Sequence, residues 1–152
     1  MEGPFTAPDM NEMHAYWLTK RGQRRMPSRC DIEPTEIPRL LRNLMLIDVL
    51  YDPIRFRYRL IGTNVVDATG ENRTGRCFDS VDFFAANPGV RKQYVAAVAT
   101  GEPVHSLEPF YRLDNRREYE AERLLLPLSS DGLAVDIVLV YFHFKSGWLA
   151  ER

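Results

Sequence analysis

The stretch Phe56-Arg57-Tyr58-Arg59-Leu60-Ile61-Gly62-Thr63 alternates between large apolar side chains and arginines as far as Leu60. Such alternation is typical of a β-strand with one buried face, because successive side chains point to opposite sides of a sheet. The arginines belong in water, so Phe56, Tyr58 and Leu60 are predicted to point into a core. The glycine and threonine at the end of the stretch lead into a loop region.

Further strands are predicted on both sides of this one. Residues 44–51 are rich in Leu, Ile and Val, and Asp52-Pro53 ends them as a turn, which predicts an antiparallel hairpin with the strand above. The last third of the chain carries strand patterns at 104–113, 118–126 and 135–144. Turn signals separate these segments, so three more antiparallel strands are expected.

Helices are predicted before and between the strands. A capping-box-like Asp9-x-x-Glu12 opens a helix that ends near Gly22, and a second short helix is expected to start at Pro34. Asn87-Pro88 opens a third helix that ends at Gly101. The first helix carries an apolar stripe at Met10, Met13, Tyr16 and Trp17. The second carries Ile37, Leu40, Leu41 and Leu44, and the third Val90, Tyr94, Ala97 and Val98. Loops and one-turn helices are expected over 62–82, and the whole order predicts an α+β fold.

Composition limits the classes of function. The chain has 152 residues, 45% hydrophobic and 27% charged, which fits one globular domain over 1–152. Twenty basic and 21 acidic residues give a net charge of −1, so no overall field favours nucleic acid or an anionic membrane. No apolar run approaches the roughly 20 residues that span a bilayer. We therefore expect a soluble, cytoplasmic protein.

Several local motifs share a family resemblance. They are Tyr16-Trp17, Pro27-Ser28-Arg29, Asp31-Ile32-x-Pro34, Asp48-Val49-Leu50, the stretch at 56–63, and Gly70-x-x-x-Thr74-Gly75-Arg76. In this order they resemble a PAS domain, and specifically the stand-alone bacterial single-PAS proteins common in alphaproteobacteria. The resemblance implies a five-stranded antiparallel sheet of order 2-1-5-4-3 with flanking short helices over 44–144. It also implies an N-terminal helical extension over 1–43, packed on the other face of the sheet or swapped into a dimer.

The resemblance places a ligand pocket between the sheet and the third helix. Its predicted lining is Phe56, Tyr58, Leu60, Tyr94 and Val98, with Thr74 and His105 as polar edges. The ligand and any cofactor stay unknown at this stage.

Cofactor chemistry finds little support in the sequence. The run Gly75-Arg76-Cys77-Phe78 is similar to the flavin-binding light sensors among PAS domains, but Asp79 follows it and the amide side chains that read a flavin are missing. A buried structural role is therefore favoured for Cys77. No histidine lies in 90–100 to ligate haem, and the histidines have no metal-ligand spacing. No metal and no catalytic residue is predicted.

A dimer is predicted from two charged stripes. Arg55, Arg57 and Arg59 would face Glu118, Glu120 and Glu122 of a second copy across a two-fold axis. Met13 and Trp17 would supply the apolar part of this face. The alternative is that both stripes are solvated or covered by the N-terminal helix.

Three functions are considered. The first is a non-enzymatic sensory or regulatory module that binds a small ligand, a signalling partner or both. The alternative is a small cone-shaped α+β enzyme of the isomerase or dehydratase type, which needs Asp, His or Tyr groups with shifted pKa values in the cavity. A third rests on five cations at 20–29 that could bind phosphate or nucleic acid. No aromatic residue interrupts that run, so a solvated loop paired with nearby acids is favoured.

Overall fold

The computed structural model describes residues 3–144 of the chain. Its main sheet has five antiparallel strands in the order β2 (Arg55–Ile61), β1 (Leu44–Leu50), β7 (Ile137–His143), β6 (Glu122–Leu128) and β3 (Val104–Ser106). Counted along the main sheet this is the predicted order 2-1-5-4-3, which is confirmed. The turn at 112–117 closes a separate hairpin of β4 (Phe110–Tyr111) and β5 (Glu118–Tyr119).

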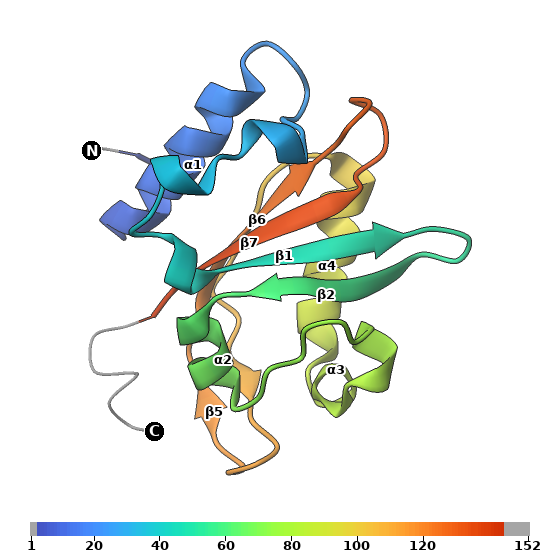
Figure 1. The fold of residues 1–152 in the computed structure, drawn as a ribbon. Helices are drawn as coiled ribbons and strands as arrows, with labels where there is room; N and C mark the ends of the chain where they lie inside the picture. Colours follow the sequence, from blue (N-terminus) through green and yellow to red (C-terminus); the bar gives the residue numbers. More distant parts are fainter. Residues whose placement is uncertain (1–2, 145–152) are drawn as a thin grey trace.

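Helices lie on both faces of the sheet. They are α1 (Pro8–Arg21), α2 (Thr63–Thr69), α3 (Asp82–Ala86) and α4 (Pro88–Thr100). Figure 1 shows α1 on one face of β6 and β7, with α4 behind the same strands and α2 and α3 beside β2. We call the α4 side the inner face and the α1 side the outer face. No helix among residues 3–144 has the length and apolarity to cross a membrane.

The N-terminal helix is anchored on the outer face by its apolar stripe. Met10, Met13 and Trp17 have 0% exposed surface, and Trp17 Nε1 donates a hydrogen bond to the Pro127 carbonyl of β6 at 3.0 Å. Three residues of the predicted stripe are therefore buried against the sheet, and the fourth, Tyr16, is half-buried. Met13 and Trp17 cannot form part of the predicted dimer face, because the sheet of the same protomer covers them.

The start of α1 differs from the predicted capping box. Ala7 is the N-cap and no side chain caps the helix. The Asp9 carboxylate lies in the first turn and accepts a hydrogen bond from the Tyr141 hydroxyl at 2.7 Å. It also lies 2.9 Å from His143 Nδ1. Asp9 thus ties α1 to β7, and the predicted cap is wrong because the N-cap is Ala7, two residues before Asp9, so that Asp9 lies inside the helix.

The short helix predicted from Pro34 is replaced by two 3-10 turns, Pro34–Glu36 and Leu41–Asn43. Pro38 explains the difference, because a proline four residues into a helix has no N–H for the i→i−4 bond and clashes with the preceding turn. Ile37 and Leu40 are nevertheless buried, so the apolar pattern reports burial correctly although the helix is absent.

A β-bulge changes the strand from which the sequence analysis began. Ile47 faces Tyr58, whereas Leu46 faces Leu60, so Arg59 is an extra residue in β2. Beyond it the alternation reverses. Leu60 is 44% exposed, and its predicted inward orientation is wrong, while the next residue, Ile61, packs against the core.

The arginines of β2 find their partner on the same sheet. Asp48 of β1, with a side chain 9% exposed, pairs with Arg57 at 3.0 Å and with Arg59 at 3.2 Å. These two members of the predicted dimer face are therefore engaged within the protomer. Of the opposite stripe, Glu120 is exposed and Glu122 is half-buried.

The basic loop at 20–29 is also engaged within the chain. Lys20 pairs with Glu36 at 2.9 Å. Arg24 pairs with Asp31 at 2.8 Å. The pairing with nearby acids that the sequence favoured is thus present for these two cations, whereas Arg25 donates to the Thr100 carbonyl and Arg29 to the Ile32 carbonyl.

Candidate functional site

A small cavity lies between the inner face of the sheet and the helices α2 to α4. Its volume is about 30 Å³, above the roughly 10–15 Å³ that one water molecule requires. Most of its lining is apolar. The aromatic part of that lining comes from Tyr58, Phe83, Phe84, Tyr94, Phe110, Phe142 and Phe144. Thr69, Arg73 and Arg123 are the other polar side chains that reach it.

A cluster of rings fills the space beside the cavity, between β2 and α4. Phe78 is its centre: its ring lies 3.9 Å from Phe84 in a stacked arrangement and 5.0 Å from Tyr94 in an edge-to-face arrangement. Phe56 and Tyr58 complete the cluster at 5.3 and 5.0 Å from Phe78. Offset and edge-to-face pairs add to the stability that burial already gives. The cluster is therefore a rigid wall for the cavity.

The two tyrosines of the cavity keep their protons. Burial raises the pKa of Tyr94, and burial also raises the pKa of Tyr58, with the positive charge of Arg73 acting in the opposite direction. Both hydroxyls are consequently neutral hydrogen-bond donors at physiological pH.

Arg123 brings a charge into this apolar setting. It lies on β6, is 2% exposed, and donates one hydrogen bond, from Nη1 to the Glu108 carbonyl at 3.0 Å. Its guanidinium carbon lies 5.9 Å from the ring centre of Phe110 and 5.7 Å from that of Phe142. Burial lowers the pKa of Arg123. Among residues 3–144, no carboxylate forms an ion pair with it.

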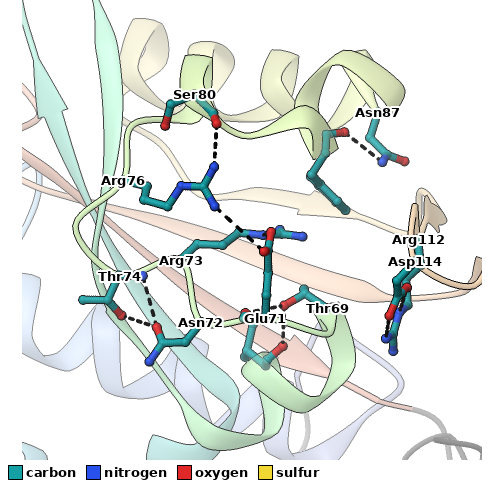
Figure 2. A network of polar contacts seen from close by, with 12 residues as sticks. Thr69, Glu71, Asn72, Arg73, Thr74, Arg76, Ser80, Asn87, Arg112 and Asp114 are labelled. Atoms are coloured by element: carbon teal, nitrogen blue, oxygen red, sulfur yellow. Dashed lines mark hydrogen bonds and ion pairs between the residues drawn. The ribbon is translucent and has the colours of Figure 1, made fainter.

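An open cleft of about 370 Å³ adjoins the cavity on the side of α2, α3 and the β4–β5 hairpin. Thr69, Arg73 and Phe83 line both spaces, so they form the partition between them. The Arg73 guanidinium lies 4.6 Å above the Phe83 ring, and its Nε donates to Glu71 Oε1 at 2.9 Å. Figure 2 shows Arg73 and Glu71 side by side above α2. The partition is thus held by one stacked cation and one ion pair.

The rest of the cleft is a network of local polar contacts (Figure 2). Glu71 also lies 3.8 Å from Arg76, which donates to the Ser80 carbonyl at 2.6 Å. On the far side Arg112 pairs with Asp114 and donates to the Ala68 carbonyl at 3.1 Å. Gly70 ends α2 with φ +91°, and a Cβ there would lie 2.5 Å from the Arg112 side chain. A glycine is therefore required where the cleft turns.

The predicted pocket residues separate into two groups. Phe56, Tyr58 and Tyr94 come together in the ring cluster, and Tyr58 and Tyr94 line the cavity. Val98 is half-buried against the core but is not part of the lining. Leu60 points away, as described for the bulge.

The two predicted polar edges lie elsewhere. Thr74 is exposed, and its hydroxyl donates to Asn72 Oδ1 at 2.6 Å. His105 is on the outer face, with Nε2 2.6 Å from a Glu122 carboxylate oxygen and its ring 4.7 Å from that of Phe5. Because side chains of β3 alternate, the inward position next to it belongs to Ser106, which bonds α4 through Gln93 at 2.7 Å.

Arg123 and the rings of Phe78, Phe83 and Phe84 were missed in the sequence. Phe78 lies in the region 62–82 assigned to loops and short helices, and Phe83 and Phe84 lie between that region and the helix predicted from Asn87-Pro88. One feature of the sequence could have indicated that Arg123 is buried. Arg123 directly precedes the apolar run Leu124 to Leu126.

Comparison with known proteins identifies the fold. A family model described as PAS domain matches residues 5–140, and the chain belongs to this family. No curated protein matches the chain.

Solved structures show the same fold at low identity. The PAS domain of the fruit-fly ELK potassium channel is 12% identical, with 78% of this chain and 98% of that chain covered and a TM-score of 0.57. A Rhodobacter sphaeroides light-oxygen-voltage (LOV) protein is 15% identical, with 76% and 69% covered and a TM-score of 0.54. A LOV domain studied with a flavin analogue is 13% identical, with 77% and 87% covered and a TM-score of 0.55. The chain thus has the PAS sensory fold, which is typical of ligand-binding signalling modules.

The residues of the cavity do not fit a flavin. Cys77 is half-buried, pairs through its backbone with Arg57, and is not part of the cavity lining. The ring cluster occupies the space between β2 and α4, and about 30 Å³ is left beside it.

Proposed function

We propose that this protein is a non-enzymatic sensory module that binds a small molecule in the inner cavity and passes the signal to a second chain. The observation that carries the proposal is the composition of the cavity wall. Five polar side chains, among them the buried Arg123, line an otherwise apolar enclosure. Ligand sites have this character, with mostly apolar walls and a few placed polar groups.

Strand β6 connects the cavity with the N-terminal helix, which suggests a route for the signal. Arg123 of β6 reaches the cavity on the inner face, and the Pro127 carbonyl of the same strand holds Trp17 of α1 on the outer face. A ligand that displaces Arg123 therefore acts on the strand to which the N-terminal helix is bonded.

The chemistry of the lining supports a non-enzymatic role. The described lining residues include no carboxylate and no histidine, and burial moves the pKa values of Tyr58 and Tyr94 upward, away from neutral pH. General acid–base catalysis requires a group that titrates near the working pH. No observation favours the isomerase or dehydratase alternative.

The wider setting is part of the proposal. The motifs quoted above support membership of the alphaproteobacterial single-PAS proteins, and we place the protein in the cytoplasm. The second chain is proposed to be another copy, in a homodimer, or a signalling partner. Sedimentation across a concentration series distinguishes these two.

The test is native mass spectrometry of the protein purified from its own host. Ala68 of α2 lines the cavity, whereas Ala96 of α4 is exposed, so Ala68→Val fills the cavity and Ala96→Val is a matched control. We expect near-stoichiometric small-molecule mass in the wild type and in Ala96→Val, and its loss in Ala68→Val. No bound mass in any of the three proteins would contradict the proposal.

A further inference from the structure

The buried charges of the described chain are paired, with one exception. Asp48, Arg73 and Arg112 are buried, and each has an ion-pair partner. Arg123 is more deeply buried than any of them, and no carboxylate among residues 3–144 lies within 4 Å of it. Because a charge removed from water is costly unless it is paired, an unpaired buried guanidinium needs a reason.

The contacts of Arg123 balance its charge only in part. A guanidinium has five N–H donors, and the described structure gives it one hydrogen bond, to the Glu108 carbonyl. The faces of Phe110 and Phe142 add cation–π attraction but no formal negative charge. The guanidinium also forms part of the wall of the cavity, so a group inside the cavity can reach it.

The other polar groups of the cavity also suit a negative charge. Tyr58 and Tyr94 line the cavity with neutral phenol groups that can donate a hydrogen bond, and Arg73, paired with Glu71, lies at the partition. No described lining side chain is acidic. A cation would therefore be repelled, and a neutral molecule would leave Arg123 without a counter-charge.

We propose that the ligand of the cavity is a small organic acid whose carboxylate pairs with Arg123. This inference rests on the proposed function and names its ligand class. Arg–carboxylate pairs are commonly bidentate, and the planar guanidinium fixes the direction of the acid. The apolar body of the acid packs against the phenylalanine rings.

The size of the two spaces sets the position of the acid. About 30 Å³ holds a carboxylate but not an aromatic body. The body extends toward the cleft of about 370 Å³, past the partition of Arg73 and Phe83. Binding therefore moves the Arg73 guanidinium off the Phe83 ring.

The test compares acids with their neutral amides on the full chain. Benzoate and phenylacetate are titrated at pH 7 against benzamide and phenylacetamide, and binding is followed by amide chemical shifts and by calorimetry. Arg123→Met removes the charge at nearly constant length. Arg91→Met, on α4 and outside the cavity lining, is the matched control, and circular dichroism verifies that both fold.

We expect the wild type and Arg91→Met to bind an acid at least tenfold tighter than its amide, and Arg123→Met to bind both equally. Equal binding of acid and amide to the wild type, or a preference that survives in Arg123→Met, overturns the inference. Amide binding without acid binding, or a native ligand that has no acidic group, overturns it while the proposed sensory function stands. If no compound binds and no native ligand is found, the proposed function fails as well.

Discussion

Replacing Arg123 by methionine should leave the free energy of unfolding unchanged or raise it by about 1–2 kcal/mol. The effective cost of burying one cation is several kcal/mol after relaxation. Against this stand one charge-assisted hydrogen bond of about 1.5–3 kcal/mol and cation–π contacts of roughly 0.5–2 kcal/mol each. The two sides nearly cancel. Arg123 thus contributes little net stability in the unliganded protein.

Methionine removes the charge and keeps most of the buried stem. Its flexible thioether packs well against aromatic rings, of which Phe110 and Phe142 are the nearest. The Glu108 carbonyl loses its donor, but Glu108 is an exposed residue, so water can replace the guanidinium. The substitution therefore leaves no unpaired polar group sealed in the core.

Urea unfolding measures the effect. Trp17 is fully buried, so its fluorescence reports the loss of the packed state alongside circular dichroism. The slope of the unfolding free energy with urea should not change between wild type, Arg123→Met and Arg91→Met. A loss of more than about 1 kcal/mol in Arg123→Met alone would refute the reasoning, since the arginine would then stabilise the fold in its own right.

Three further predictions concern stability. Tyr58→Ala should cost about 3 kcal/mol in urea unfolding, because a large ring leaves the cluster around Phe78; a loss below about 1 kcal/mol would show that the rings are loosely packed. Arg57→Gln with Arg59→Gln should cost about 1–2 kcal/mol by leaving the Asp48 carboxylate without a cation, and Asp48→Asn in the same chain should recover most of it. Additive losses would exclude this pairing. Burial, followed by the charge of Arg21, lowers the pKa of His14, so the folded state binds its proton less tightly than the unfolded state does. Stability should therefore fall as the pH drops below about 6.5, and His14→Gln should reduce that fall when the urea midpoints at pH 5 and pH 7.5 are compared.

The sequence predicted elements that local chemistry specifies. Asn87-Pro88 and Gly101 predict the two ends of a helix, and α4 runs from Pro88 to Thr100 with Gly101 at φ +66°. Strand alternation placed Phe56 and Tyr58 inward correctly. In both cases the residues that determine the structure lie close together in the sequence, at the ends of one helix or along one strand.

The wrong predictions concern features that depend on contacts between strands far apart in the sequence, or on a shift of one residue within a strand. The bulge at Arg59 depends on how β2 pairs with β1, which the alternation of β2 alone does not show. The sequence predicts the strand of His105 but does not show which of its residues face the cavity, and a shift of one residue exchanges the two faces of a strand. Arg123 was missed because a cation on a strand is normally assigned to solvent. Its burial follows from the position of β6 inside the sheet.

The unpaired Arg123 links ligand affinity to the stability of β6. In the unliganded protein the strand carries a buried charge that its neighbours balance only in part, and a carboxylate supplies the missing charge. A ligand at 100 times its Kd stabilises the folded state by about 2.7 kcal/mol, which exceeds the net contribution expected from the arginine alone. That gain falls on the strand whose Pro127 carbonyl holds Trp17, so hydrogen exchange on binding should slow most along β6 and at the α1 contact. Protection confined to α2 and α3 would instead mean that the acid binds only in the open cleft beside these helices, and that the signal does not pass through the sheet.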